Sequence, residues 1–279
     1  MPLAAAPCAA FIFADSFESG DVSAWSSAVG YPPATAFRAT DLDLRDPHVF
    51  LDAGPFGCLD FTDLALPGDL VPSLNGSLEA AIGGDEDGDG LFDLSVLSIF
   101  RPLTVDTAEA IFESRRGECA APPAAPGCDP AVDGTSVTTY STADAGLCLT
   151  TVPGTTSGYS PGILEPAAPC FVTPPVPITV QLVGVELPLR STRIAASFVG
   201  DPPTLLDPGL IAGFLAEADA DSVTLPADLP IVGGQPLSII FPGGTGNCAP
   251  GDDRDQLEGV DGWWLYLELV ASPVPYSIP

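Results

Sequence analysis

The sequence predicts a mainly β protein: an antiparallel β-sandwich of the jelly-roll type, with one short helix and long loops closed by disulfides. Its 279 residues include 32 prolines and 29 glycines, which divide the chain into short apolar runs typical of strands. Hydrophobic residues make up 46% of the chain, enough to bury a sizeable core. The seven cysteines include no C-x-x-C pair, which favours disulfides over a zinc site.

The clearest strand is expected over 263–271, where side chains alternate between two faces that are both rich in large apolar residues. We therefore expect a central strand that is buried on both sides. Shorter apolar runs bounded by turn-forming residues predict the other strands. These are 10–13, 49–53, 56–61, 77–82, 94–101, 109–113, 136–141, 147–151, 178–187, 192–199 and 237–241.

One helix is expected, over 208–218. Asp207 is a suitable N-cap, and Pro208 fits the first turn of a helix. Apolar side chains then recur at helical spacing, at Leu210, Ile211, Phe214, Leu215 and Ala218.

The chain is expected to form a single large β domain over residues 15–279. Residues 117–176 hold four of the seven cysteines and are rich in proline, glycine, alanine and threonine, so we interpret them as one long excursion closed by disulfides. Residues 1–14 resemble the trimmed end of a signal peptide. Cys8 in this segment is lipidated, paired or free, and Pro7 before it departs from the usual lipid-attachment pattern.

The cysteines predict a compartment more oxidising than the cytosol. Four of them bracket two loops that have few means of ordering themselves without covalent closure. We therefore expect secretion or export to the cell surface. The expected disulfides are Cys119–Cys128, Cys148–Cys170 and Cys58–Cys248.

The chain is strongly acidic, with 37 aspartate and glutamate residues, 8 arginines, no lysine and a formal net charge of −29. Such a charge repels nucleic acid and anionic membrane surfaces, which argues against both as partners. The sequence contains no apolar run of about 18 residues, so it predicts no membrane-spanning helix. Adaptation to high salt would spread the acids over the surface, whereas here they cluster. The clusters at 41–46, 85–93, 217–221 and 252–255 favour bound cations.

The segment 85–93, DEDGDGLFD, is the one specific chemical signal. Carboxylates at its first, third and fifth positions converge on a hard cation, and glycine at the sixth permits a sharp turn. The pattern resembles the D-x-D-x-D-G loops of EF-hands, dockerins and thrombospondin type-3 repeats, which place Glu or Asp where this chain has Val96. A second segment or water must therefore supply the missing oxygen. The expected Ca²⁺ ligands are the side chains of Asp85, Asp87, Asp89 and Asp93 and the carbonyl of Leu91.

Two further acidic clusters are weaker candidates. Asp252, Asp253 and Asp255 surround Arg254 in the sequence. They form either a second metal site or a cluster whose charge the arginine partly neutralises. Three other carboxylates would end the expected helix, where its dipole disfavours negative charge and a cation would relieve the cost. These are Glu217, Asp219 and Asp221.

No catalytic constellation is evident, so we lean towards a protein that is not an enzyme. Residues 158–162 match G-x-S-x-G, but Pro161 follows the serine and has no N–H for an oxyanion hole, so we interpret the segment as a turn. His48, the only histidine, has Asp46 nearby but is expected in a loop entering a strand, with a structural role.

A glycoside hydrolase would need two carboxylates, and the sequence does not select two among Glu79, Glu109, Glu113, Glu186 and Glu268. Aromatic side chains that could stack on sugars are Trp25, Tyr31, Trp263 and Trp264. The tandem tryptophans lie in an apolar strand, which favours a place in the core.

Two stretches resemble exported bacterial proteins. Residues 12–26, IFADSFESGDVSAWS, are similar to the D-x-F-E-x-G-x-x-x-x-W segment that follows the signal peptide in adhesin-like and carbohydrate-associated β domains. Residues 213–249 with GWWLYLELVA resemble uncharacterised exported or lipoprotein-like proteins of myxobacteria-like lineages, in which a DGDG loop leading into a strand like LSVLSIFRPL recurs. The resemblance covers the greater part of the chain. It implies export and calcium, and supplies no catalytic residue.

We therefore expect a non-catalytic secreted or cell-surface β protein, stabilised by calcium, with a structural, adhesive or extracellular-matrix role. A carbohydrate-binding module or glycan-degrading enzyme is one alternative. A self-assembling filament subunit, whose strand 10–13 pairs with a neighbour's sheet edge, is another. The expected partners are further copies of the chain or an extracellular polysaccharide.

Overall fold

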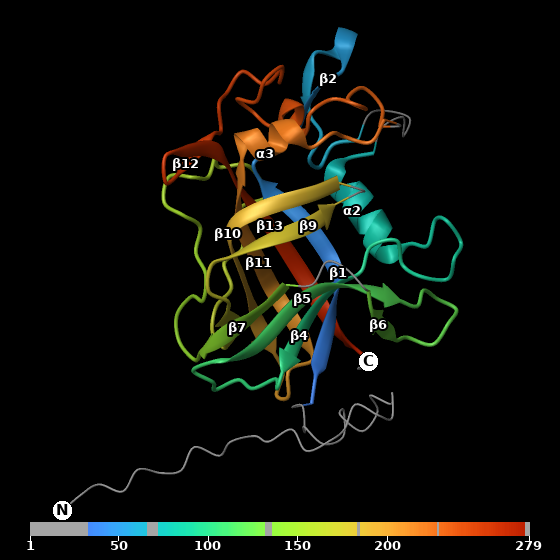
Figure 1. The fold of residues 1–279 in the computed structure, drawn as a ribbon, viewed down its shortest axis with the longest axis vertical. Coiled ribbons are helices and arrows are strands. Elements are labelled where there is room, and N and C mark those ends of the chain that lie inside the picture. The colour runs from blue at the N-terminus through green and yellow to red at the C-terminus, as the bar shows by residue number, and fades with distance from the viewer. Residues whose placement is uncertain (1–32, 66–71, 132–135, 183–184, 228, 277–279) are drawn as a thin grey trace, which may run out of the picture. The chain divides into compact units, whose positions relative to one another are not determined.

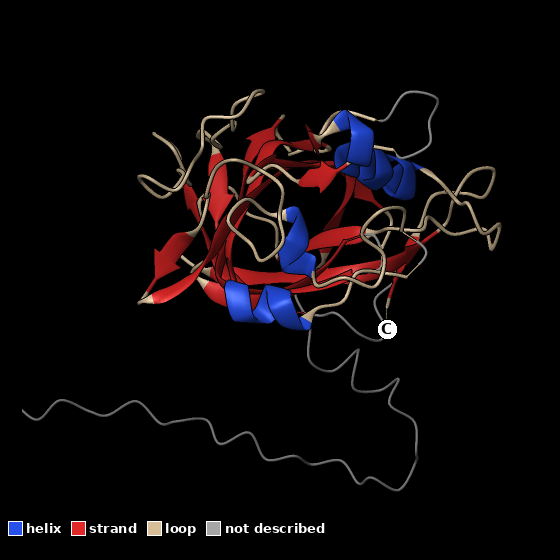
Figure 2. Ribbon diagram, turned by 90° about the horizontal axis from the view of Figure 1, so that it is seen from above, coloured by secondary structure: helices blue, strands red, loops and turns tan. Residues whose placement is uncertain are grey.

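Eight strands form a closed antiparallel sheet. The computed structural model describes residues 33–65, 72–131, 136–182, 185–227 and 229–276. The strands pair in the order β1–β4–β5–β7–β8–β10–β11–β13, and β13 pairs back onto β1, which closes the sheet into a ring (Figure 1). Figure 2 shows the strands surrounding a shared interior. The bounds are β1 Thr35–Asp46, β4 Val96–Arg101, β5 Ala110–Cys119, β7 Ser136–Ala143, β8 Cys170–Val172, β10 Val185–Val199, β11 Leu205–Ala216 and β13 Val260–Val274.

Shorter elements extend the ring. Three strands pair onto its members, and one separate hairpin joins β2 to β3. In Figure 1, β2, α2 and α3 lie towards the upper end of the sheet. The bounds are β2 Phe50–Asp52, β3 Cys58–Asp60, β6 Cys128–Pro130, β9 Val176–Leu182 and β12 Asp255–Leu257, with helices α2 Leu74–Gly83 and α3 Glu217–Ser222 and 3₁₀ turns η1 Gly54–Phe56 and η2 Leu237–Ile240. Among the described residues, no helix is long and apolar enough to cross a membrane.

The mainly antiparallel β class predicted from the sequence is confirmed, and opposite sides of the sheet pack face to face across one core, as in a sandwich. Phe100 on β4 and Phe171 on β8 meet edge to face, with ring centroids 4.9 Å apart. Phe100 is the centre of an aromatic cluster with Phe37, Phe112, Tyr140, Phe171 and Phe198. Offset and edge-to-face pairs of this kind add stability beyond the area that they bury.

The interior changes character from one end to the other. Strand β1 contributes Phe37 to the aromatic cluster near its start and the aliphatic Leu44 near its end. Strand β10 runs the opposite way, from Leu187 near its start to Phe198 near its end. One end of the ring is therefore filled by aromatic rings and the other is lined by aliphatic side chains.

The predicted excursion covers the outer faces of the ring. Leu149 packs on an outer apolar cluster that includes Phe214 of β11 and Trp264 of β13, and a disulfide closes this loop. On β1, β4 and β5, the hairpin closed by a second disulfide covers a smaller cluster around Leu97 and Ile99. All three expected disulfides are present: Cys119–Cys128, Cys148–Cys170 and Cys58–Cys248. Cys8 lies outside the described residues.

The helix predicted over 208–218 is wrong, because Leu205–Ala216 forms strand β11 between β10 and β13. Leu210 and Phe214 belong to the outer cluster, whereas Ile211 and Leu215 belong to the inner core. Since both faces of this strand are buried, its apolar residues satisfy helical spacing and strand alternation alike. The segment forms a strand because it pairs with β10 on one side and with β13 on the other.

The strand predicted over 77–82 is also wrong, because this segment lies in α2. Ser73 caps the helix by accepting the N–H of Gly76 at 3.1 Å. Leu78 and Ile82 are four residues apart and both buried, which is the spacing of one helix face. Two helices are therefore present where one was expected.

The remaining expected strands fare unevenly. Residues 263–271 form the middle of β13, which pairs with β1 and β11 and is buried on both faces, as predicted. Residues 237–241 form η2 and not a strand, and residues 147–151 contribute only an isolated bridge at Leu147. The expected strand 10–13 lies outside the described residues.

Candidate functional site

The predicted calcium loop joins α2 to β4. Its carboxylates Asp85, Asp87 and Asp89 each offer an oxygen, and these oxygens lie within 4.8 Å of one another. They form the one group of three metal-binding side chains found among the described residues. Carboxylate oxygens are the ligands that Ca²⁺ prefers, so the donor set fits this ion.

The backbone of the loop orients these carboxylates. Asp85 Oδ2 accepts the N–H of Gly90 at 3.0 Å, and Asp89 Oδ1 accepts the N–H of Leu91 at 2.8 Å. The φ angles of Gly88 and Gly90 are 75° and 90°, in the region that favours glycine and allows the tight turn. Asp85 Oδ1 is buried and has no hydrogen-bond partner within the part of the chain that the structure describes. This oxygen is therefore free to bind a cation.

Asp93 is not part of this group of carboxylates. Asp93 Oδ2 accepts the N–H of Glu86 at 3.1 Å, which braces the two ends of the loop against each other. Leu91 makes an isolated bridge with Ala120. The structure thus brings together three of the four predicted side-chain ligands and gives the fourth a bracing contact.

The loop is fixed to three parts of the fold. Its Phe92 donates its backbone N–H to Cys119 O at 3.0 Å, and its Gly90 accepts the N–H of Ala121 at 2.9 Å. The guanidinium of Arg38 lies 4.0 Å from the centroid of the Phe92 ring and donates to Ile82 O at 2.8 Å. A bound cation would therefore stiffen the junction of α2, β1 and the Cys119–Cys128 hairpin.

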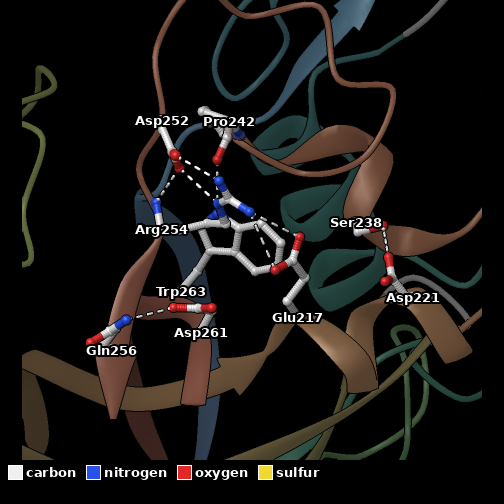
Figure 3. A network of polar contacts seen from close by, with 9 residues as sticks. All are labelled: Glu217, Asp221, Ser238, Pro242, Asp252, Arg254, Gln256, Asp261 and Trp263. Atoms are coloured by element: carbon white, nitrogen blue, oxygen red, sulfur yellow. Dashed lines mark hydrogen bonds and ion pairs between the residues drawn. The ribbon is translucent and has the colours of Figure 1, made fainter. Parts of the chain in front are cut away.

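The second predicted cluster is not assembled as a metal site. Figure 3 shows Arg254 between Asp252 and Glu217, with Nη2 2.8 Å from Asp252 Oδ2. This ion pair holds the pKa of Asp252 below its usual range. Asp253 accepts the hydroxyl hydrogen of Tyr159, and Asp255 accepts a backbone N–H at 3.2 Å. Of these three aspartates, Arg254 therefore neutralises Asp252 alone, and the other two carboxylates have uncharged partners.

The expected location of the third cluster is wrong. Glu217 and Asp219 lie in the first turn of α3, where the helix dipole favours their charge, and only Asp221 lies towards the end of this helix. Asp219 forms an ion pair with Arg190 at 2.7 Å, and Asp221 accepts the hydroxyl hydrogen of Ser238 (Figure 3).

His48 lies in a buried polar cluster that sequence reasoning missed. Its Nδ1 donates to Asp60 Oδ2 at 2.5 Å, and its ring stacks on Tyr159 with centroids 3.9 Å apart. Nε2 is buried and has no partner among the described residues. The neighbouring Asp46 accepts the N–H of Ser157 at 2.8 Å instead of pairing with the histidine. Tyr159 belongs to the G-x-S-x-G segment, which is a loop as expected.

Burial and hydrogen bonding shift the pKa values of Asp46 and Asp60 in opposite directions. Burial raises the pKa of Asp46 to about 6, although the hydrogen bond from Ser157 opposes the shift. Burial would also raise the pKa of Asp60, but hydrogen bonds from His48 and Thr62 outweigh it and hold that pKa below its usual range. Asp60 is therefore the ionised partner of the histidine.

Two of the glutamates considered for glycan chemistry form ion pairs with arginines, and the tandem tryptophans lie in the core. Glu113 forms an ion pair with Arg101 at 2.6 Å, and Glu268 pairs with Arg45 at 2.8 Å. Trp263 is fully buried and donates its indole N–H to Pro242 O at 2.9 Å (Figure 3). Trp264 is also buried, so neither tryptophan offers a surface for sugars. Trp25 and Tyr31 lie outside the described residues.

Fold and site together define a class: a disulfide-bonded, acidic, antiparallel β protein with one loop whose carboxylates could hold a cation. No protein-family model matches the chain, and no curated protein or solved structure matches it.

Proposed function

We propose that this chain is an exported or cell-surface β protein, stabilised by Ca²⁺ bound at 85–93, with a structural or adhesive role rather than a catalytic one. The observation that carries the proposal is the buried, unpaired Oδ1 of Asp85 beside the carboxylates of Asp87 and Asp89. Three negative charges at this separation repel one another unless a cation lies between them.

The surroundings support a stabilising role for the ion. The loop connects the end of α2 to β4 and is hydrogen-bonded to the end of β5. A ligand that binds only the folded chain stabilises it by mass action. Calcium at this junction would therefore stabilise the ring and the loop over its outer face together.

Export is supported by the disulfides. Structural disulfides persist in extracellular and periplasmic compartments and are rare in the reducing cytosol. Two of the three in this chain close the loops that cover the outer faces of the ring. A reducing compartment would open both covers.

Thermal unfolding with CaCl₂ and with EDTA tests the calcium part. We expect saturating Ca²⁺ to raise the melting temperature by about 5–10 °C, since a ligand at about 100 times its Kd contributes about 2.7 kcal/mol. The double variant Asp85→Asn/Asp87→Asn should lose this increase. The control Asp106→Asn/Asp201→Asn makes the same charge change at exposed positions and should keep it. Identical melting of the unsubstituted chain in EDTA and calcium would refute the site.

The structural or adhesive role needs a separate measurement. Light scattering and negative-stain microscopy, with and without calcium, should show assembly or attachment to extracellular polysaccharide. A chain that stays monomeric and binds no polysaccharide contradicts this role while leaving the calcium site intact. Hydrolysis of a polysaccharide panel would instead favour the glycan-degrading alternative.

A further inference from the structure

A cavity lies at the aliphatic end of the ring. The walls of the ring supply Leu44 from β1, Leu187 from β10 and Leu265 from β13. The cover comes from α2, from the β2–β3 hairpin and from the segment between α3 and η2. Segments that are far apart in the sequence therefore enclose one space.

The volume of this cavity is about 140 Å³. Protein interiors are packed as densely as organic crystals, and voids larger than one water molecule are few. The opposite end of the same interior is filled by the aromatic cluster around Phe100. The space at the aliphatic end is thus too large for ordinary packing imperfection.

The lining sets the chemistry of an occupant. Among the described residues the lining contains no charged side chain, and its one side-chain hydroxyl, on Ser77, already donates to Ser73 O at 2.9 Å. Water needs two to four polar partners to stay bound in a cavity, so this lining favours an apolar occupant over ordered water. An engineered cavity of about 150 Å³ with a similar aliphatic and aromatic lining stays dry and binds benzene.

The cavity has an opening towards solvent. Most of its lining residues are buried or half-buried, but Pro72 and Pro230 are exposed and mark the mouth. Beside Pro230, Ile231 has a φ of 72°, which is strained for a β-branched residue. Its neighbour Val232 is buried in the cavity lining and donates its N–H to Pro230 O at 2.8 Å. This strained turn holds Pro230 and Val232 at the mouth.

We propose that this cavity binds one small, uncharged, apolar molecule, of the size of a single aromatic ring or a short alkyl chain. The volume limits the size, the apolar side chains of the described lining disfavour an ion, and the mouth at Pro72 and Pro230 provides access. Binding would not involve the calcium loop, whose carboxylates Asp85, Asp87 and Asp89 do not line this cavity.

Calorimetric titration of the full chain with benzene and toluene tests this site, with benzoate as the charged counterpart. We expect saturable binding of one molecule of benzene or toluene and none of benzoate. Ser77→Leu and Val232→Phe add bulk to the lining and should each weaken benzene binding at least tenfold. Val137→Phe adds an aromatic ring at an exposed position of β7 and should leave binding unchanged.

A variant that enlarges the cavity serves as a control, because a gain of binding cannot result from misfolding. Phe241→Leu removes the ring of a lining residue, so the cavity should accept a larger molecule, and propylbenzene should bind more tightly than to the unsubstituted chain. The proposal is overturned if benzene shows no saturable binding up to its solubility. It is equally overturned if the folded Ser77→Leu variant binds benzene as the unsubstituted chain does.

Discussion

At the scale of single residues, the polar cluster around His48 shows what a sequence does not reveal. Asp46 is two positions from the histidine and was the natural candidate partner, yet Asp60 pairs with it and Tyr159 stacks on it. Asp60 reaches the histidine because the β2–β3 hairpin pairs it with Phe50, and Tyr159 comes from the distant loop between β7 and β8. The calcium loop, in contrast, gathers its carboxylates within nine consecutive residues, so a local pattern is enough to find it.

Asp46 should make stability depend on pH. Its folded-state pKa of about 6 lies above the usual value of an aspartate, so the folded chain holds the proton more tightly than the unfolded chain. The stability that this group contributes is present at about pH 4 and lost as the pH rises to about 6. Asp46→Asn should therefore stabilise the protein by about 1–2 kcal/mol at pH 8 and by little at pH 4.

Urea unfolding at both pH values measures this difference. Asparagine keeps the oxygen that accepts the N–H of Ser157, so the variant isolates the charge. Asp106→Asn, at an exposed position, serves as the control and should change little at either pH. If Asp46→Asn changes the free energy of unfolding equally at pH 4 and pH 8, the negative charge of Asp46 does not destabilise the folded protein.

At the scale of elements, burial on both faces decides which strands a sequence reveals. β13 is long and alternates without interruption, so it is predicted correctly. β1 was not predicted as a strand, because its pairing with β13 shifts register between Ala39 and Asp41 and again between Leu44 and Asp46. These shifts break the alternation, and its outward aspartates indicated a cation cluster instead. One of them, Asp43, pairs with Arg45 at 2.7 Å.

The three disulfides should contribute unequally to the free energy of unfolding. Their sequence separations are 9 for Cys119–Cys128, 22 for Cys148–Cys170 and 190 for Cys58–Cys248. In the chain-entropy model the losses on replacing each pair by alanines are about 2.5, 3.5 and 5 kcal/mol. Denaturant unfolding of the three double variants measures the order. If the pair with the longest loop costs least, constraint of the unfolded chain does not dominate.

At the scale of the whole molecule, a charge of −29 acts against the compact state. Few of the carboxylates are neutralised by arginine, since the chain has 8 arginines for 37 acids. Ions in solution therefore reduce a repulsion that the folded chain cannot relieve internally. Composition alone predicts this property, whereas the cavity depends on segments that only the closed sheet brings together.

Salt should stabilise the protein independently of calcium. Raising NaCl from about 10 mM to about 1 M shortens the Debye length from about 30 to about 3 Å, so the melting temperature should rise in EDTA as well. Asp85→Asn/Asp87→Asn should respond almost as the unsubstituted chain does, because it removes two charges of many. Choline chloride should act similarly to NaCl. Melting that is insensitive to both salts would show that the acids are too dispersed to destabilise the fold.

Closure of the ring through β1 and β13 also protects the protein from amyloid-like polymerisation. Each of its eight strands has a neighbour on both sides, so the long apolar strand β13 offers no open row of backbone donors and acceptors as a template for a foreign chain. The ring strand β13 is therefore closed to a foreign chain on both sides, whereas the short strands β9 and β12 each pair with one neighbour only.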